Sequence, residues 1–573
     1  TRAALLLMLA AALGTLAAAH AATWTRSQAD QAAFRTAADA RAVASDYSAL
    51  ETWAAGPRYR AIPGVTAATP LTIAPLDVGR TIRDGLLAGV DPEAVGSIGN
   101  VSAGNAALID TLAQQSFEVA AKPLPGNPRR IAVTIDAAFD ADPTVETSVE
   151  TDGTIPQNGA AIRVTAILRD ADGRLFRTST ASGVVDRPAQ RLILTLTNPT
   201  APDLRPAGPL AIEAIELQID VLDQIAIFGS VDLIALEVSD AVSGDDGWTS
   251  VELPAGAIGW AWTLFDGSPT ATAYTPPPGA PNRIAIGRAA ELFGGFGNPG
   301  LVFRLYAGPP RDAPLAAIAS RTFLDRTGAA VGDELGISSL GQALRVKVVG
   351  MTELFAPFDP ARPALIVDIA ALDVVRFLGA GRTDQADEWW LTLEPGGEPA
   401  VLVALRERTA GTSEVIGRAE LTRSLSTDPV PLGLIGVLGL GSLAAMLFAG
   451  IGFLVSSTIS TSERFGEFAL LRALGLSTGQ LSLWLSIESI FLLGVGLAMG
   501  SALGFLLAWL VLPFATLTQT GLPPIPAPEV IVPWEAIVPT YLGAIALFIL
   551  SLWLVRRQLP DIRISGVLRA RES

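Results

Sequence analysis

A short segment with the charge spacing of a docking helix is the part of the sequence best suited to recognising another protein. It runs from Ser460 to Gly475 and holds two glutamates, two arginines and two phenylalanines. Ser460 and Glu463 have the spacing of a capping box. Glu463 and Glu467 lie near the helix N-terminus, where the helix dipole favours anions. Arg472 in the last turn and Gly475 after it complete the signals of a short helix.

The apolar residues of this predicted helix lie on more than one side. Phe465, Phe468 and Ala469 share one side, whereas Leu470 and Leu474 share another. A helix that is apolar on two sides needs two surfaces to cover it. Membrane helices supply one surface, and a separate protein docked from the cytoplasm supplies the other. The alternative is a short connector that lies on the lipid interface.

The side chains that enzymes use are scarce in this chain. It contains no Cys and a single His, His20, which excludes thiolate chemistry and His-cluster metal sites. Because His20 lies in a Leu/Ala-rich run, the sequence also argues against a Ser-His-Asp triad. Neither of its two lysines, Lys122 and Lys347, follows a Gly, which excludes a phosphate-binding loop of an ATPase. The net charge of −16 argues against a nucleic-acid partner. We therefore expect no enzyme activity, no catalytic residue, no metal and no cofactor.

The hydrophobic runs predict an α+β membrane protein with four transmembrane helices, arranged as one and then three. Half of the 573 residues are hydrophobic (50%). Four runs are long enough to cross the ~30 Å hydrocarbon core of a bilayer. We place the four spans at 1–23, 431–458, 481–511 and 536–556. A cleaved signal peptide is the alternative for the first run, because it ends in Ala-His-Ala-Ala.

The arginines predict the orientation of these spans. Arginines occur in the connection at 459–480 and in the tail at 557–573, whereas the Pro-rich loop at 512–535 has no basic residue. Cytoplasmic connections carry the excess of Lys and Arg. We therefore expect 459–480 and the tail inside, and 24–430 and 512–535 outside.

Glu488 is the one charged residue inside the third run. An ionisable side chain inside a membrane costs ~3 kcal/mol or more unless it has a partner. It therefore marks a functional or packing site that faces the bundle interior. The alternative is that it lies close enough to the cytoplasmic interface to be hydrated.

The region outside the membrane changes its pattern twice. Residues 24–127 and 276–430 mix helix and strand, with helices expected at Ser27–Asp46 and Val101–Gln115. Residues 128–275 alternate polar and apolar residues between turn signals, which predicts a β-sandwich. The clearest strands are Arg130–Ile135, Ala161–Arg169, Arg191–Leu196, Leu210–Val221, Arg345–Val349 and Ala364–Asp368.

Three tryptophans in the β-rich segment have two interpretations. Trp248, Trp260 and Trp262 are close together in the sequence. They form either a platform for stacking a sugar or part of the apolar core.

The docking segment resembles a known family. Its pattern, Glu463-Arg464-x-x-Glu467-x-x-x-Leu471-Arg472-Ala473-Leu474-Gly475, is similar to a loop of FtsX/MacB-type ABC transporter permeases. In that family the loop is the coupling helix that touches the ATPase subunit. The resemblance therefore implies that the ATPase is contacted by Glu463, Arg464, Glu467, Phe468, Leu471, Arg472 and Gly475.

The resemblance extends to the topology of one span, a large external region and three further spans. Segments at 331–335, 346–350 and 364–368 resemble the periplasmic core domain of the family, whereas 128–275 looks like an insertion. Large members of the family duplicate the four-span unit. A chain that starts at Thr1, directly before a span, resembles the second half of such a duplicated permease.

The resemblance implies a permease subunit in the plasma membrane. Its implied partners are an ABC ATPase on the cytoplasmic side, a second permease half or a second copy of the chain, and the lipid membrane. Systems of this family export or extract lipids, lipoproteins, peptides or drugs, or signal to cell-wall enzymes. The alternative function is a membrane-anchored adhesion protein whose β-sandwich binds a glycan or a protein.

Overall fold

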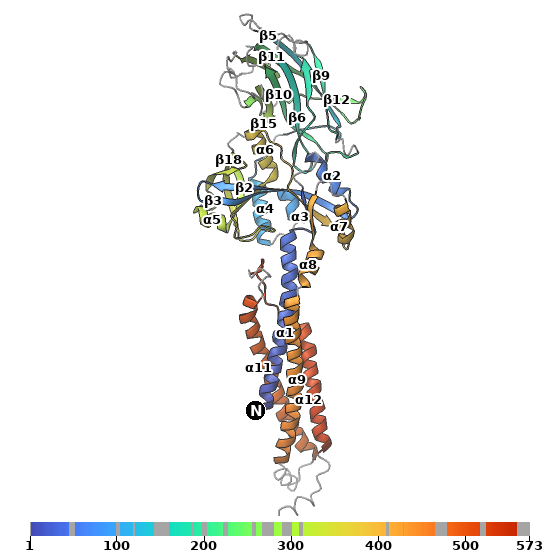
Figure 1. Ribbon diagram of the computed structural model, residues 1–573, viewed down its shortest axis with the longest axis vertical. Coiled ribbons are helices and arrows are strands. Elements are labelled where there is room, and N and C mark those ends of the chain that lie inside the picture. The colour runs from blue at the N-terminus through green and yellow to red at the C-terminus, as the bar shows by residue number, and fades with distance from the viewer. Residues whose placement is uncertain are drawn as a thin grey trace, which may run out of the picture. The chain divides into compact units, whose positions relative to one another are not determined.

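The chain folds into two units, which are described separately (Figure 1). The computed structural model describes the chain except for residues 1, 45–51, 99–102, 118–120, 142–159, 185–187, 198–202, 222–226, 255–258, 266–279, 289–300, 309–312, 408–411, 428, 464–477, 516–522 and 559–573. The helical unit comprises Thr1–Phe34 and Ala419–Ser573, and the β-rich unit comprises Arg35–Arg418. The chain therefore passes between the units twice.

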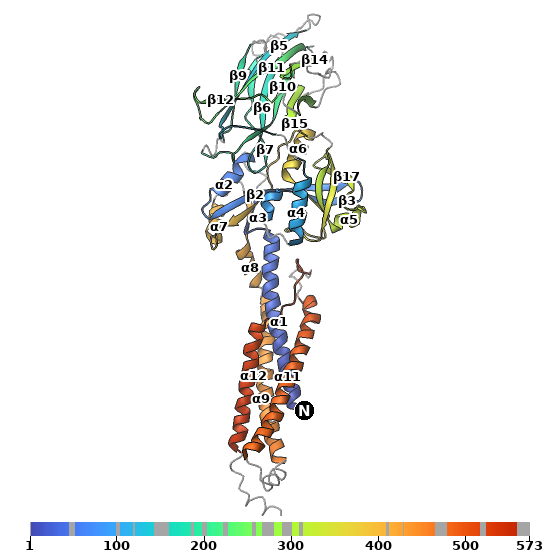
Figure 2. The same ribbon diagram turned by 180° about the vertical axis from the view of Figure 1, so that it is seen from behind.

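Long helices make up most of the described part of the helical unit (Figure 1, Figure 2). They are α1 (Arg2–Thr36), α9 (Pro429–Glu463), α11 (Thr478–Ala515) and α12 (Trp534–Gln558). Three stretches within them are long and apolar enough to cross a membrane: Leu5–Thr36, Leu432–Ser456 and Ile490–Leu512. The apolar stretch of α12, Trp534–Leu550, is shorter than these. The structure therefore supports three of the four predicted spans, and the fourth stays a prediction.

The first helix is longer than the sequence predicts. It runs without interruption through the end of the predicted span at residue 23 and stops at Thr36. The helix expected at Ser27–Asp46 is confirmed as far as Thr36 and wrong at residues 40–44, which form a strand, whereas residues 45–46 lie outside the described residues. Ala37 adopts a left-handed conformation with φ 59°. This conformation ends the helix at a cost, since left-handed backbone is unfavourable for residues other than Gly.

One half of the β-rich unit is built on a nine-stranded sheet of order β17-β18-β16-β19-β3-β2-β20-β1-β21. Its strands are β1 (Ala40–Ala44), β2 (Val65–Val78), β3 (Ile82–Val90), β16 (Leu315–Ser320), β17 (Glu334–Ser339), β18 (Gln342–Thr352), β19 (Ala364–Asp368), β20 (Glu388–Leu393) and β21 (Thr412–Gly417). Because β17 also pairs with β2, six of these strands close into a ring. The strands expected at Arg345–Val349 and Ala364–Asp368 are confirmed as parts of β18 and β19.

Short helices accompany this sheet in the β-rich unit. They are α2 (Ala55–Arg60), α3 (Pro92–Ile98), α4 (Ala103–Gln115), α5 (Arg321–Thr327), α6 (Ile369–Ala380), α7 (Glu398–Glu407) and the start of α8 (Arg418–Ser426), together with the 3-10 turn Thr52–Ala54. Helix α6 is the most buried of them. Asp368 accepts the N–H of Ala370 at its N-terminus, and Gly381 with φ 67° follows its C-terminus. Both ends therefore have the caps that stabilise a helix.

The other half of the β-rich unit consists of two antiparallel sheets. One has the order β13-β15-β10-β6-β7, with β4 beside β10 and β8 beside β6, and the other has the order β12-β11-β5-β9, with β14 beside β11. The strands are β4 (Lys122–Pro123), β5 (Arg130–Ala141), β6 (Ala160–Arg169), β7 (Leu175–Arg177), β8 (Ala181–Val184), β9 (Gln190–Thr195), β10 (Ala211–Val221), β11 (Ile227–Ser239), β12 (Trp248–Val251), β13 (Trp260–Phe265), β14 (Arg283–Arg288) and β15 (Leu301–Ala307).

The two sheets share one core because their strands alternate. Ile131, Val133, Ile135, Ala137 and Phe139 of β5 are all buried in a cluster that also includes residues of β6, β10 and β11. The predicted strands at 130–135, 161–169, 191–196 and 210–221 are confirmed by β5, β6, β9 and β10, with Leu196 and Leu210 one residue outside β9 and β10. The strands β14 and β15 lie C-terminal to the segment 128–275 but pair within these same sheets.

A buried ionic joint connects the seven-stranded sheet to α6. Arg304 of β15 donates to Glu216 (2.8 Å) and to the carbonyl of Phe377 (3.0 Å). Arg177 of β7 donates to the same Glu216 (2.8 Å) and to the carbonyl of Gly381 (2.9 Å). Burial alone would raise the pKa of Glu216, but the hydrogen bonds and charges of Arg177 and Arg304 outweigh it and lower that pKa. The joint therefore holds a carboxylate between two guanidinium groups at the C-terminus of α6.

Asp170, in the turn between β6 and β7, makes the stability of this half of the β-rich unit depend on pH. Its carboxyl accepts the N–H groups of Asp172 (3.0 Å) and Arg174 (2.9 Å). Burial, and then the charge of Asp172, raise the pKa of Asp170 to about 7. The folded chain therefore retains this proton over a pH range in which the unfolded chain, with an Asp pKa of about 3.9, has lost it.

We predict that the substitution Asp170→Asn removes this contribution. Below about pH 4, Asp170 does not make the free energy of unfolding depend on pH. As the pH rises from about 4 to about 7, Asp170 lowers the free energy of unfolding, and above about pH 7 its contribution no longer changes. The difference in the free energy of unfolding between wild type and Asp170→Asn should change by ~4 kcal/mol across this window. Denaturant unfolding of the detergent-purified chain at pH 4, 5.5, 7 and 8 measures it. A difference that does not vary with pH would contradict the prediction.

Candidate functional site

The docking segment lies in the connection at 459–480, which we call the predicted coupling segment. Most of it falls outside the described residues. Glu463 is the last residue of α9. Six further predicted contact residues lie in 464–477, outside the residues that the structure describes: Arg464, Glu467, Phe468, Leu471, Arg472 and Gly475. Glu488 lies within α11. The segment therefore connects α9 to α11, and the role of its residues stays a prediction.

Small residues on α11 let α1 approach it closely. A Cβ atom added to Gly500 would lie 2.4 Å from the carbonyl oxygen of Met8, and one added to Gly504 would lie 2.5 Å from that of Ala12. One turn further along, Ala508 is buried against Ala19. Helices in membranes associate through such small residues, because lipid gives no hydrophobic drive for association. The sequence reasoning missed this contact, although the four-residue spacing of Gly500, Gly504 and Ala508 is visible.

The other helices of the helical unit also make specific contacts. The rings of Phe453 on α9 and Phe548 on α12 lie 4.3 Å apart between centroids. Ser501 on α11 hydrogen-bonds Tyr541 on α12. The hydroxyl of Thr23 on α1 accepts the N–H of Ile531, which precedes α12 (3.1 Å). Each helix is therefore joined to at least one other helix of the unit or to its connecting segment.

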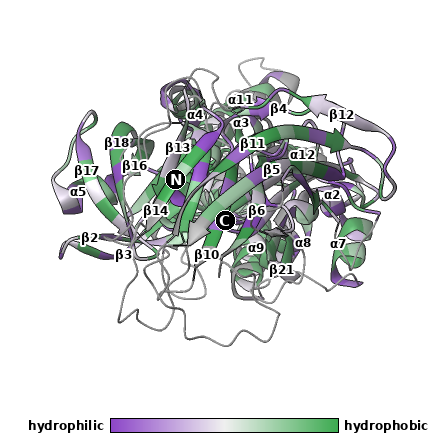
Figure 3. Cartoon of the chain, turned by 90° about the horizontal axis from the view of Figure 1, so that it is seen from above, coloured by the Kyte–Doolittle hydropathy of each residue, from purple (hydrophilic) through white to green (hydrophobic). Residues whose placement is uncertain are grey.

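The outward faces of these helices are apolar and exposed. Leu440 and Phe448 on α9 are 70% and 66% exposed, and Phe491 on α11 is 68% exposed. Figure 3 shows that α9 is predominantly hydrophobic. Exposed apolar surface of this extent marks contact with lipid or with another protein. The helical unit is therefore built as a membrane bundle.

The two chain connections leave the β-rich unit from neighbouring strands. β1, which follows α1, and β21, which precedes α8, pair antiparallel from Ala40 opposite Gly417 to Val43 opposite Glu414. Asp39 lies just before β1, and its carboxylate contacts the guanidinium of Arg418 (2.6 Å) and accepts the N–H of Leu393 (3.0 Å). The carbonyl of Asp39 also accepts the N–H of Arg418 (2.9 Å). We call Asp39 and Arg418 the junction pair.

The tryptophans do not form one platform. Trp248 lies on β12 in the five-stranded sheet, whereas Trp260 and Trp262 lie on β13 in the seven-stranded sheet. Trp262 is buried in the core shared by the two sheets. The ring of Trp248 is flanked by the guanidinium groups of Arg130 (4.8 Å) and Arg191 (4.1 Å). This arrangement favours the interpretation as core and cation-π packing.

The described residues show no group of three or more His, Asp or Glu side chains that could hold a metal ion. What they show is a bundle of apolar helices, joined to a β-rich unit through two paired strands. These features define a membrane protein that contains a bundle of apolar helices and a large folded β-rich unit.

The helical unit includes a segment that matches a known protein family. Residues 439–559 match the family model described as the FtsX-like permease C-terminal domain. The match extends from α9 through α11 and α12 and includes the predicted coupling segment. The resemblance to FtsX-like permeases is thereby confirmed. These permeases are transport subunits without enzyme activity of their own and generally work with ABC ATPases. No curated protein matches the chain.

We predict that Gly504→Ala destabilises the helical unit. Its Cβ would meet the backbone of α1, and overpacking of this kind costs about 1–3 kcal/mol. Gly494→Ala is the matched control, because Gly494 lies on the same helix with nothing within 4 Å of the added atom. Thermal unfolding of the detergent-purified variants measures the effect. Equal melting temperatures for the two variants would show that the close approach of α1 and α11 does not matter for stability.

Proposed function

We propose that the chain is the permease subunit of an ABC-type system, in which a separate ATPase moves the helices and thereby the β-rich unit. The observation that carries this proposal is the FtsX-like domain at 439–559, which includes the connection between α9 and α11. The chain crosses the plasma membrane four times in this proposal, with α12 as the fourth span and the β-rich unit outside. The contact of Gly500 and Gly504 with α1 supports α1 as a retained member of the bundle.

The proposed coupling begins at the cytoplasmic segment 459–480. ATP-driven movement of the partner ATPase displaces this segment, and α9 and α11 carry the displacement because they are continuous with it. The proposal keeps a core-like part of mixed helix and strand on either side of a β-sandwich, with β14 and β15 assigned to the sandwich because they pair within its sheets. A second permease half, or a second copy of the chain, completes the assembly.

The junction pair is the proposed point at which displacement enters the β-rich unit. The end of α1 and the start of α8 are the two covalent routes into it. Asp39 and Arg418 hold these two routes together through a charge pair and a main-chain hydrogen bond. A displacement of either route therefore acts on the same strand pair of the sheet.

The first test of this function concerns the coupling segment. We predict that Phe468→Ala weakens recruitment of the ATPase at unchanged membrane levels, since truncating a buried interface anchor costs about 2 kcal/mol or more. That corresponds to a roughly thirtyfold loss of affinity. Arg472→Ala is the comparison and should have a smaller effect that depends on salt, as expected for a charge at the rim of an interface. Co-purification of the ATPase, normalised to permease level, measures both. Unchanged recovery with Phe468→Ala would exclude this residue as an anchor.

The second test concerns the junction pair. We predict that Asp39→Asn retains ATPase binding but reduces the movement of the β-rich unit, because the charge pair with Arg418 is lost. The sequence lacks Cys, so spin labels at Trp534→Cys and Val403→Cys report the distance between the two units. In complex with the ATPase, the ATP-dependent change of this distance should shrink in Asp39→Asn. Arg326→Gln is the control, because it removes another exposed pair, with Asp84, away from the junction. Equal distance changes in wild type and Asp39→Asn would contradict the role of the pair.

A further inference from the structure

Strand β2 has two partners along one edge, and a gap separates them. Its pairing with β20 ends at Leu71 opposite Glu388, and its pairing with β17 occurs at Asp77 opposite Ser338. Between these positions no strand of the described residues pairs with this edge, whereas the other edge stays paired with β3. At about 3.4 Å per residue, the paired positions lie about 20 Å apart.

The main-chain groups of Ile73 and Pro75 face this gap. The N–H of Ile73 donates to the side chain of Asp387 (2.6 Å), which lies on the side away from β3. Pro75 pairs in register with Leu86 of β3, but the N–H of Leu86 donates to Pro363 instead (2.9 Å). In an antiparallel pair, the N–H and C=O of one residue point to the same side. The carbonyls of Ile73 and Pro75 therefore both point toward the gap.

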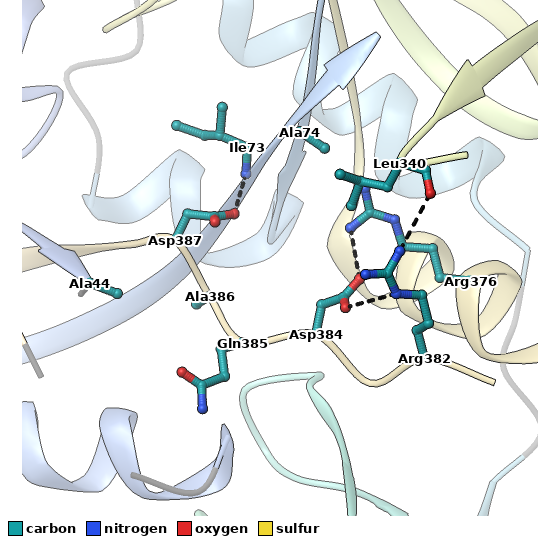
Figure 4. A pocket seen from close by; sticks show the side chains of 10 residues that line it. All are labelled: Ala44, Ile73, Ala74, Leu340, Arg376, Arg382, Asp384, Gln385, Ala386 and Asp387. Atoms are coloured by element: carbon teal, nitrogen blue, oxygen red, sulfur yellow. Dashed lines mark hydrogen bonds and ion pairs between the residues drawn. The ribbon is translucent and has the colours of Figure 1, made fainter. Parts of the chain in front are cut away.

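A cavity of about 480 Å³ lies at the gap (Figure 4). Ile73 and Ala74 of β2 line one side, and residues 384–387, which precede β20, line the other. Leu340, in the turn between β17 and β18, lines it as well. This volume is in the range of sites that hold small ligands.

The charged groups of the cavity balance one another. Asp384 lies between Arg376 (3.4 Å) and Arg382 (3.7 Å), and the second carboxylate, Asp387, accepts the N–H of Ile73. Two arginines and two aspartates give no excess charge, so the cavity is not suited to a phosphate or another strong anion. The cavity lies at a strand edge that offers carbonyl oxygens as hydrogen-bond acceptors. A matching ligand therefore needs hydrogen-bond donors with the spacing of a β-strand.

We propose that this gap binds a short extended peptide, which adds to β2 as a strand between β20 and β17 and donates main-chain N–H groups to the carbonyls of Ile73 and Pro75. Addition of a strand to an open sheet edge is an established mode of peptide recognition. The two flanking strands limit the length of the peptide. This inference goes beyond the proposed permease function and rests on the geometry of the β-rich unit alone.

The test uses the full chain in detergent and a pool of random pentapeptides, acetylated and amidated at their ends. A second pool, N-methylated along the backbone, lacks the donors that the strand edge requires. We expect the chain to retain the unmethylated pool about tenfold better, which corresponds to ~1.4 kcal/mol. Mass spectrometry of the peptides that co-elute with the chain measures retention. Equal retention of the two pools would overturn the proposal.

A substitution and its matched control locate the binding. Gln385→Trp fills the cavity from its lining and should abolish the preference for unmethylated peptides, whereas Gln114→Trp, at an exposed position on α4 that does not line it, should not. Undiminished retention by Gln385→Trp would place the binding elsewhere and overturn the proposal.

A second measurement does not depend on the folding of the tryptophan variant. The thiol of Leu340→Cys reports the cavity, and that of Val331→Cys, 55% exposed in the native residue, reports a surface outside it. The retained peptides should slow alkylation by N-ethylmaleimide at the first position only. Slowing by neutral oligosaccharides in place of peptides would overturn the peptide assignment. None of these results depends on the ATPase, so failure here leaves the proposed permease function intact.

Discussion

The antiparallel pairing of β1 with β21 is the constraint on which the arrangement of the β-rich unit depends. Only residues 37–39 separate α1 from β1, and α8 begins at Arg418, directly after β21. A shift of this pairing by one residue would turn every side chain to the opposite face of the sheet, so its register is strongly fixed. Asp39 reinforces the register through its contacts with Arg418 and Leu393. Both covalent routes into the unit are therefore held at one place in one sheet.

The rest of the β-rich unit is connected to this strand pair through successive strand pairings and side-chain contacts. β1 also pairs with β20, β20 pairs with β2, and β2 enters the closed ring of six strands. The ring core includes residues of α6, and the C-terminus of α6 is held by Arg177 and Arg304 of the seven-stranded sheet. Breaking a buried charge network by removing one partner is strongly destabilising, because it leaves an uncompensated charge. The two halves of the β-rich unit are therefore joined at α6 by these charged contacts as well as by an apolar cluster that includes Ile167 and Phe377.

Local patterns in the sequence predict some of this structure and miss the parts that depend on distant partners. Alternation predicts β5, β6, β9 and β10, because each has one face in a core. It misses β1, whose Ala-rich sequence favours a helix and becomes a strand through pairing with β20 and β21. Glu216 and Arg304 are 88 residues apart, so no local pattern reveals their contact. The apolar runs predict the helices, whereas the coupling residues from Arg464 to Gly475 stay predictions because they lie outside the described residues.

The gap along β2 is a consequence of the same connectivity. β2 spans 14 residues, because it pairs with β20 on one side of the sheet and with β17 where the ring closes. An open strand edge is able to pair with other chains, and native proteins prevent this with Pro or charged side chains at the edge. Here Pro75 offers no N–H, and the carboxylate of Asp387 takes that of Ile73. The edge thus keeps its acceptors but has lost the donors that a long foreign strand would need. Since β20 forms one end of the gap and also pairs with β1, a single strand connects the strand pair of the junction with the proposed peptide site.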